Sequence, residues 1–181
     1  MPEQTNLSSE LDAPSLLSET TVMFKMLPAT HSCFVCGQRN PSGLKLRFET
    51  DGSLVRTRFL PSEATVGFKG VVHGGLLATV LDEIMVWACA VPTRRFAFCA
   101  ELNVRFVNSL APGEEVLVTG ELVANRRNRL FETKATAQTA TGRVLAEATG
   151  KYIPIKPEQL PPMLGELVGG AEWLRSFSAE A

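Results

Sequence analysis

One short run of the sequence spaces residue types suited to carbonyl chemistry along a predicted helix. His73, Gly74 and Gly75 open this helix, and Asp82 and Glu83 follow about two turns later. The first amide N–H groups of a helix lack intrahelical acceptors and lie at the positive end of its dipole, so they can polarise a carbonyl or hold an oxyanion. The alternative is that both glycines only permit close helix–sheet packing. The residues alone leave the two readings open.

Asp82 and Glu83 are the only charged residues between Leu76 and Ala90. Burying an unpaired carboxylate is expensive, so we expect a partner, solvent or a functional cavity beside them. The alternative is a helix face exposed at this point, with both acids in water. Adjacent helical residues point about 100° apart, so the two acids need not face one cleft.

The spacing between Gly74 and Asp82 bears on where a site could be assembled. Eight residues correspond to roughly 12 Å along a helix, whereas one reacting carbonyl must lie about 3 Å from both its oxyanion donor and its attacking group. Two copies of the helix lying antiparallel across a twofold axis can meet both demands. If the segment is catalytic, we therefore predict an active site shared between subunits.

The elements that must position these residues follow from hydrophobic periodicity. The helix is apolar almost all round, which predicts burial on most sides, and Pro92 is expected to end it. Residues 44–48 alternate as a strand, and Asp51-Gly52 predicts a hairpin to a second strand over 54–60. Four more strands are predicted over 96–107, 115–124, 130–139 and 144–153. Short turns favour antiparallel pairing, so we expect an α+β fold in which one curved antiparallel sheet of five to six strands wraps around a long central helix.

The chain divides into a core and two extensions. We predict an N-terminal extension over 1–30, whose segment 16–27 is weakly helical in pattern, a single domain over 31–155 and a C-terminal extension over 156–181. Prolines and glycines after Lys156 predict a loop followed at most by a short helix around Trp173.

Composition excludes several classes of function. The 181 residues carry a formal net charge of −1, which argues against broad nucleic-acid binding. No apolar run approaches the length of a membrane span, and the N-terminus lacks the pattern of a secretory signal. With four cysteines and no export signal, we expect reduced thiols and a cytoplasmic protein.

Three segments of this sequence resemble a known family. The run VVHGGLLATVLDE, preceded by GFKG and followed by CAELNVRFVNSLAPGE, resembles the hotdog-fold acyl-CoA thioesterases of the PaaI-like group, and CFVCGQRNPSGLKLRF resembles N-terminal segments of that group. The similarity spans roughly residues 31–155. It implies a hotdog fold, homodimers that often pair into tetramers, and an acyl-CoA substrate with no cofactor.

The resemblance also implies roles for individual residues. In the family, the first glycine after the histidine donates its N–H to the thioester carbonyl, which is Gly74 here. The helix acid, used as nucleophile or as general base for water, corresponds to Asp82. A Ser or Thr that assists water corresponds to Cys99, whose thiol is a weaker hydrogen-bonding group. An Asn or Gln found in some relatives is replaced by Gly67.

Besides these catalytic candidates, we predict that His73, Gly75 and Gly67 bind substrate. His73 is expected to fix the loop before the helix through a hydrogen bond; the alternative is a general base, although no Ser or Cys nucleophile lies beside it in sequence. Strand alternation places the Cys99 side chain on the opposite face of the sheet from Phe98 and Leu102. A β-bulge would change the face to which Cys99 points.

Cys33-x-x-Cys36, with His31 just before it, superficially indicates zinc. A structural zinc site normally takes four ligands, and no second pair of candidate ligands follows in the sequence. We therefore expect unligated thiols in a turn and no metal.

The sequence thus predicts a hydrolase that cleaves a fatty or aryl acyl-CoA to the free acid and CoA. One alternative is a non-catalytic acyl-CoA-binding hotdog module. A third reading is an acyl-thioester dehydratase, which His73 keeps open because such chemistry uses a His–acid pair.

Overall fold

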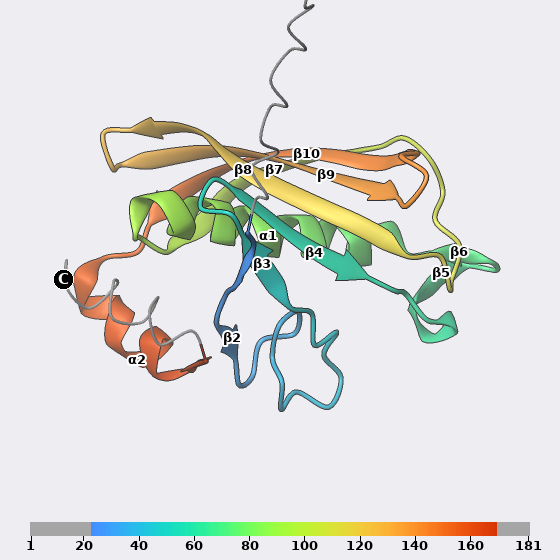
Figure 1. Ribbon diagram of the computed structural model, residues 1–181, viewed down its shortest axis with the longest axis horizontal. Coiled ribbons are helices and arrows are strands. Elements are labelled where there is room, and N and C mark those ends of the chain that lie inside the picture. The colour runs from blue at the N-terminus through green and yellow to red at the C-terminus, as the bar shows by residue number, and fades with distance from the viewer. Residues whose placement is uncertain (1–22, 170–181) are drawn as a thin grey trace, which may run out of the picture.

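A computed structural model describes residues 23–169 as one curved sheet packed against a long helix (Figure 1). The helix α1 spans Gly74–Thr93. The seven strands of the sheet lie in the order β1-β3-β4-β8-β9-β10-β7, and all neighbours are antiparallel. Their bounds are β1 Lys25–Met26, β3 Phe48–Thr50, β4 Leu54–Phe59, β7 Ala97–Phe106, β8 Val116–Arg126, β9 Leu130–Thr139 and β10 Val144–Pro154. This arrangement confirms the predicted α+β fold, with β1 adding a seventh, two-residue strand at one edge.

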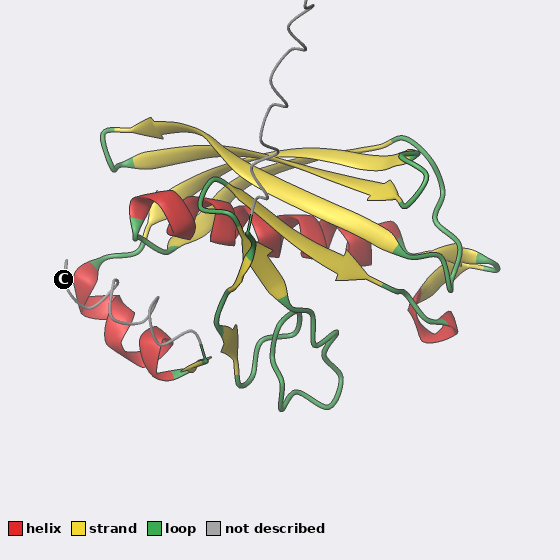
Figure 2. Ribbon diagram, in the orientation of Figure 1, coloured by secondary structure: helices red, strands yellow, loops and turns green. Residues whose placement is uncertain are grey.

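Several short strands, two 3-10 turns and a second helix lie around the sheet and α1 (Figure 2). Two-residue strands β2 (Ala29–Thr30) and β11 (Leu167–Val168) pair with each other, and β5 (Val66–Phe68) pairs with β6 (Val71–Val72) just before α1. Two 3-10 turns span Glu63–Thr65 and Pro157–Gln159, and a second helix α2 spans Leu160–Gly165.

The helix α1 is the centre of the core. His73 caps its N-terminus, and its buried side chains include Leu77, Leu81 and Ile84, packed under the sheet. Its length and mean hydropathy of 1.6 would also suit a membrane span, but those apolar side chains are covered within the protein. The helix continues one residue past Pro92 and ends at Thr93, and the C-cap Arg94 adopts a left-handed conformation.

Residues 44–47 do not form the strand that their alternation predicts. Lys45 has φ of 55°, a left-handed conformation that interrupts extended backbone. The N–H groups of Leu44 and Leu46 donate instead to the carbonyls of Phe34 and Val35, at 2.8 and 2.9 Å. This segment therefore packs on the Cys33–Cys36 turn, and the sheet strand begins only at Phe48.

The extensions contain structure that the sequence analysis missed. Lys25–Met26 form a strand where a weak helical pattern is present, while residues 16–22 and Trp173 lie outside the described residues. Leu27 is buried in the core. Residues 160–165 form helix α2 where a loop is predicted, because its two prolines occupy the first turn, in which no backbone N–H donor is needed.

Candidate active site

His73 organises the start of α1. Its Nδ1 accepts a hydrogen bond from the N–H of Gly75 at 2.9 Å, and its own N–H donates to the carbonyl of Thr65 at 2.9 Å. His73 thus acts as the predicted fixing residue, and the Gly75 N–H is engaged by it. Among the described residues nothing accepts a hydrogen bond from the N–H of Gly74. That amide is therefore the donor left for a ligand at this helix end.

A cavity of about 400 Å³ lies beside this free donor. Its lining joins Gly67, His73 and Gly74 to a mainly apolar wall that includes Phe68, Leu77, Phe106 and Leu110. Gly67 packs closely against His73, since a Cβ there would lie 3.0 Å from Cδ2 of the histidine. A larger residue at position 67 would require a shift of a few tenths of an ångström in His73 or in the loop.

Asp82 lies farther along α1 with a partner that the sequence analysis did not name. Its Oδ1 accepts a hydrogen bond of 2.7 Å from the hydroxyl of Tyr152 on β10, and that hydroxyl also lies 3.3 Å from the Asp82 carbonyl. Tyr152 is fully buried, and burial together with the Asp82 carboxylate raises its pKa well above the usual range, so it remains a donor. Tyr152 is the only tyrosine in the chain, and that singularity is the signal that could have drawn attention to it.

Cys99 joins this pair because of a bulge in β7. Glu101 pairs with Lys151 and Cys99 pairs with Tyr152, so Ala100 is an extra residue on β7. The bulge reverses the facing that simple alternation predicts and turns Cys99 toward the same side as the buried Tyr152. Partial desolvation and the neighbouring Asp82 carboxylate raise the pKa of the Cys99 thiol, which therefore stays protonated at neutral pH.

The six predicted site residues thus form two groups within one chain. Gly67, His73, Gly74 and Gly75 lie at the start of α1, where a Cβ on Gly74 would meet the ring of Phe106 at 3.2 Å. Asp82 lies with Cys99, at the opposite end of β7 from Phe106. Seven residues of strand separate these ends by about 20 Å. One chain therefore keeps the amide donor and the carboxylate apart.

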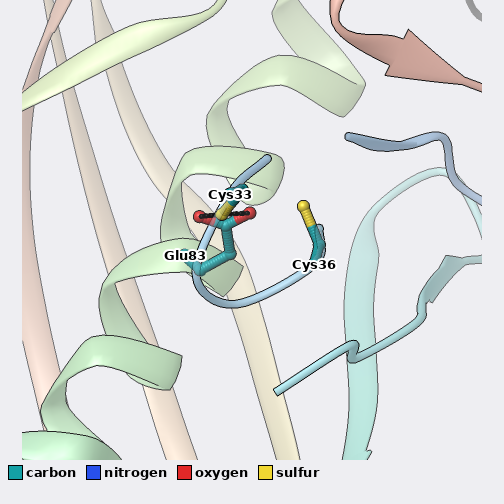
Figure 3. A group of neighbouring side chains, drawn as sticks. All are labelled: Cys33, Cys36 and Glu83. Atoms are coloured by element: carbon teal, nitrogen blue, oxygen red, sulfur yellow. Dashed lines mark hydrogen bonds between the residues drawn. The ribbon is translucent and has the colours of Figure 1, made fainter. Parts of the chain in front are cut away.

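Glu83 faces a different neighbour from Asp82. Its carboxylate lies against the Cys33 thiol, 3.7 Å from Sγ to each oxygen, with Cys36 close by (Figure 3). Burial, with a further contribution from Cys33, raises the pKa of Glu83 to about 7. The proximity of the two thiols lowers the pKa of Cys33 and, together with burial, raises that of Cys36. Asp82 and Glu83 therefore both have hydrogen-bond partners. This excludes the alternative that the helix face carrying them is simply exposed to water.

The comparisons with known proteins agree with this architecture. Residues 69–146 match the model of the Thioesterase superfamily. Acyl-coenzyme A thioesterase 13 of Homo sapiens is 25% identical over 79 residues, which cover 43% of this chain and 56% of the relative. The chain thus spans little more than half the length of the curated relatives it matches.

Solved structures give the same class of fold. A thioesterase superfamily protein of 25% identity superposes with a TM-score of 0.62, covering 68% of this chain and 60% of its own. The PaaI protein from the phenylacetic acid degradation operon of E. coli gives 0.57 at 15% identity, covering 62% and 81%. A hypothetical thioesterase of Streptococcus pneumoniae, solved with coenzyme A, gives 0.54 at 16% identity, covering 57% and 80%. These findings confirm the resemblance to the PaaI-like, hotdog-fold proteins of the thioesterase superfamily.

Proposed function

We propose that this protein is an acyl-CoA thioesterase that hydrolyses a fatty or aryl acyl-CoA in a homodimer. One observation carries the proposal: the Gly74 amide at the start of α1, which has no acceptor among the described residues, and the Asp82 carboxylate held by Tyr152 lie beside opposite ends of the edge strand β7. Relatives named as acyl-CoA thioesterases, and one solved with coenzyme A, support the substrate class. The four free thiols suit a reducing, cytoplasmic setting, which belongs to the same proposal.

We infer that the edge strand β7 joins two half-sites, the Gly74 group of one chain and the Asp82 group of another. It has no neighbour on its outer side among the described strands, and its Phe98 and Phe106 are 53% and 54% exposed. An unpaired edge carrying exposed aromatic side chains favours pairing with a second copy. Antiparallel pairing about the strand midpoint, near Leu102 and Asn103, sets Phe106 of one copy opposite Cys99 of the other. Gly74 of the first copy then approaches Asp82 of the second.

In the proposed reaction, the Gly74 N–H of one subunit polarises the thioester carbonyl and stabilises the oxyanion. Asp82 of the other subunit takes a proton from water, whose oxygen attacks the carbonyl carbon. The C–S bond then breaks, and the proton passes to the departing CoA sulfur. Direct attack by the carboxylate, with an anhydride that water then hydrolyses, uses the same geometry. Tyr152 holds the carboxylate in either version.

The acyl group is assigned to the cavity beside Gly74. Its volume of about 400 Å³ and its apolar wall suit a hydrocarbon or aromatic acyl group. The polar residues Asn108 and Ser109 also line the cavity.

The proposal is tested by release of free CoA thiol from a panel of fatty and aryl acyl-CoAs. Asp82→Asn is expected to lower kcat by at least about 100-fold, because the carboxylate that activates water or attacks is lost. Glu158→Gln, which removes an exposed carboxylate outside both half-sites, is the matched control and should retain full turnover. Unchanged turnover in folded, dimeric Asp82→Asn would refute the assignment.

A non-catalytic acyl-CoA-binding module is the second candidate, and Cys99 favours it. A protonated thiol is a weak donor and acceptor for positioning water, and it stands where relatives have Ser or Thr. Binding of acyl-CoA without thiol release would support this module. Hydration of an enoyl-CoA would instead indicate the dehydratase.

A further inference from the structure

We propose that Cys33, Cys36 and Glu83 form a binding site for a zinc ion, which would join the segment after β2 to the central helix. The two cysteines lie on one turn, and Glu83 lies 50 residues beyond Cys33 on α1. Figure 3 shows the three side chains meeting between turn and helix. The inference does not rest on the proposed hydrolase activity, because the site uses none of the residues assigned to it.

The distances fit tetrahedral zinc. The potential ligand atoms of the three residues all lie within 4.8 Å of one another. Cys33 Sγ is 3.7 Å from both oxygens of Glu83. Zinc–sulfur and zinc–oxygen bonds of about 2.3 and 2.1 Å at a tetrahedral angle place sulfur and oxygen about 3.6 Å apart. Cys33 and Glu83 are therefore already at ligand spacing, and Cys36 needs at most a small side-chain adjustment.

The backbone of the turn holds the first thiol in place. The N–H of Val35 donates to Cys33 Sγ at 3.2 Å, and the N–H of Cys33 donates to Oγ1 of Thr30 at 3.1 Å. Gly37 closes the turn with a 2.9 Å bond to the Cys33 carbonyl, and a Cβ there would lie only 2.1 Å from that oxygen. Amide donors directed at sulfur stabilise a thiolate, which is the form that binds metal. The hydrogen bonds of the turn thus preorganise the Cys33 thiol as a metal ligand.

Charge and donor chemistry identify the ion. Cys36 is buried and Glu83 is partly buried, and the described residues give Glu83 no Lys, Arg or His partner. A cation among these groups would offset the cost of burying negative charge. Two sulfur donors and one carboxylate suit zinc, whereas magnesium and calcium require oxygen ligands. Thr30 Oγ1, 3.5 Å from Cys36 Sγ, or a water would take the fourth position.

The test uses Co²⁺ and Zn²⁺ on the purified, reduced full-length protein. Co²⁺ should bind with one-to-one stoichiometry, give thiolate-to-cobalt charge-transfer absorption, and be displaced by Zn²⁺. Cys36→Ser should lose about half of the charge-transfer intensity, while Glu83→Gln should keep that absorption and bind at least about tenfold more weakly. Zn²⁺ at a hundredfold excess over Kd should raise the Tm by roughly 5–10 °C.

Cys89→Ala is the control, because Cys89 is buried in α1 outside the cluster, and its metal binding should equal that of the parent. Glu83→Gln keeps both thiols, so it tests the site even if a cysteine variant fails to fold. Affinity no tighter than millimolar, or cobalt spectra unchanged in both Cys36→Ser and Glu83→Gln, would overturn the proposal.

Discussion

At the scale of single residues, Tyr152 holds the Asp82 carboxylate through a hydrogen bond. Its hydroxyl donates a hydrogen bond of 2.7 Å to the Asp82 carboxylate, and the residue is fully buried. A carboxylate held by one donor has a fixed orientation, which is what general-base or nucleophilic chemistry needs. Tyr152 is a positioning residue, since it acts through Asp82.

Removing only the Tyr152 hydroxyl tests this role. Tyr152→Phe should lower kcat about tenfold, because a hydrogen bond to a charged group is worth about 1.5–3 kcal/mol and part of it orients Asp82. The KM for acyl-CoA should change little, since the ring stays in place. Steady-state kinetics separate the two parameters, and thermal unfolding controls for a folding defect. A rise in KM at constant kcat would assign Tyr152 to substrate binding instead.

At the scale of elements, the β3–β4 hairpin depends on one side chain in its turn. Oδ1 of Asp51 accepts bonds from the N–H groups of Ser53 and Leu54, each at 2.8 Å. The Leu54 N–H is the largest cause of the lowered pKa of Asp51. The ionised carboxylate therefore stabilises the turn that sets the β3–β4 register.

Asp51→Ala should lower the free energy of unfolding by about 1 kcal/mol at neutral pH, a modest value because the group is exposed. The lowered pKa means that this stabilisation is complete above the unfolded-state pKa, near 4, and is lost as the pH falls through the folded-state value. Denaturant unfolding at pH 7 and at pH 3–4 measures the difference in the free energy of unfolding between parent and variant. This difference should be smaller at the lower pH. A difference that grows on acidification would contradict this account.

At the scale of the whole molecule, the proposed homodimer would make activity a property of a pair of chains. Gly74→Pro removes the donor N–H at the first helical position, where proline is tolerated, and the extended backbone of His73 suits a following proline. Gly74→Ala keeps the N–H and is its steric control.

A heterodimer of Asp82→Asn and Gly74→Pro chains, isolated with two affinity tags, should recover about half the parent activity, because one of its two shared sites is intact. Each variant alone should be nearly inactive. A heterodimer of parent chain with the double variant gives the opposite test. It should be inactive if sites are shared, whereas half activity would show that one chain holds a complete site.

Much of the fold could be predicted because its signals are local. The apolar α1, the strand alternation and the Asp51-Gly52 turn each follow from the periodicity or backbone preference of neighbouring residues. The errors arose where a distant partner outweighed the local pattern. Residues 44–47 alternate like a strand, yet they hydrogen-bond to the Cys33–Cys36 turn.

The sequence by itself determined the helix with its amide-rich start, the acid on it, and the family resemblance, since these depend on residue type and spacing. Tertiary structure alone decided that Tyr152 meets Asp82, that a bulge turns the exposed Cys99 to the same side as Tyr152, and that Glu83 joins Cys33 and Cys36. Each of these pairings crosses tens of residues and depends on strand register or on the path of a loop over the helix. No local pattern encodes such contacts, because they form only when the sheet closes over α1.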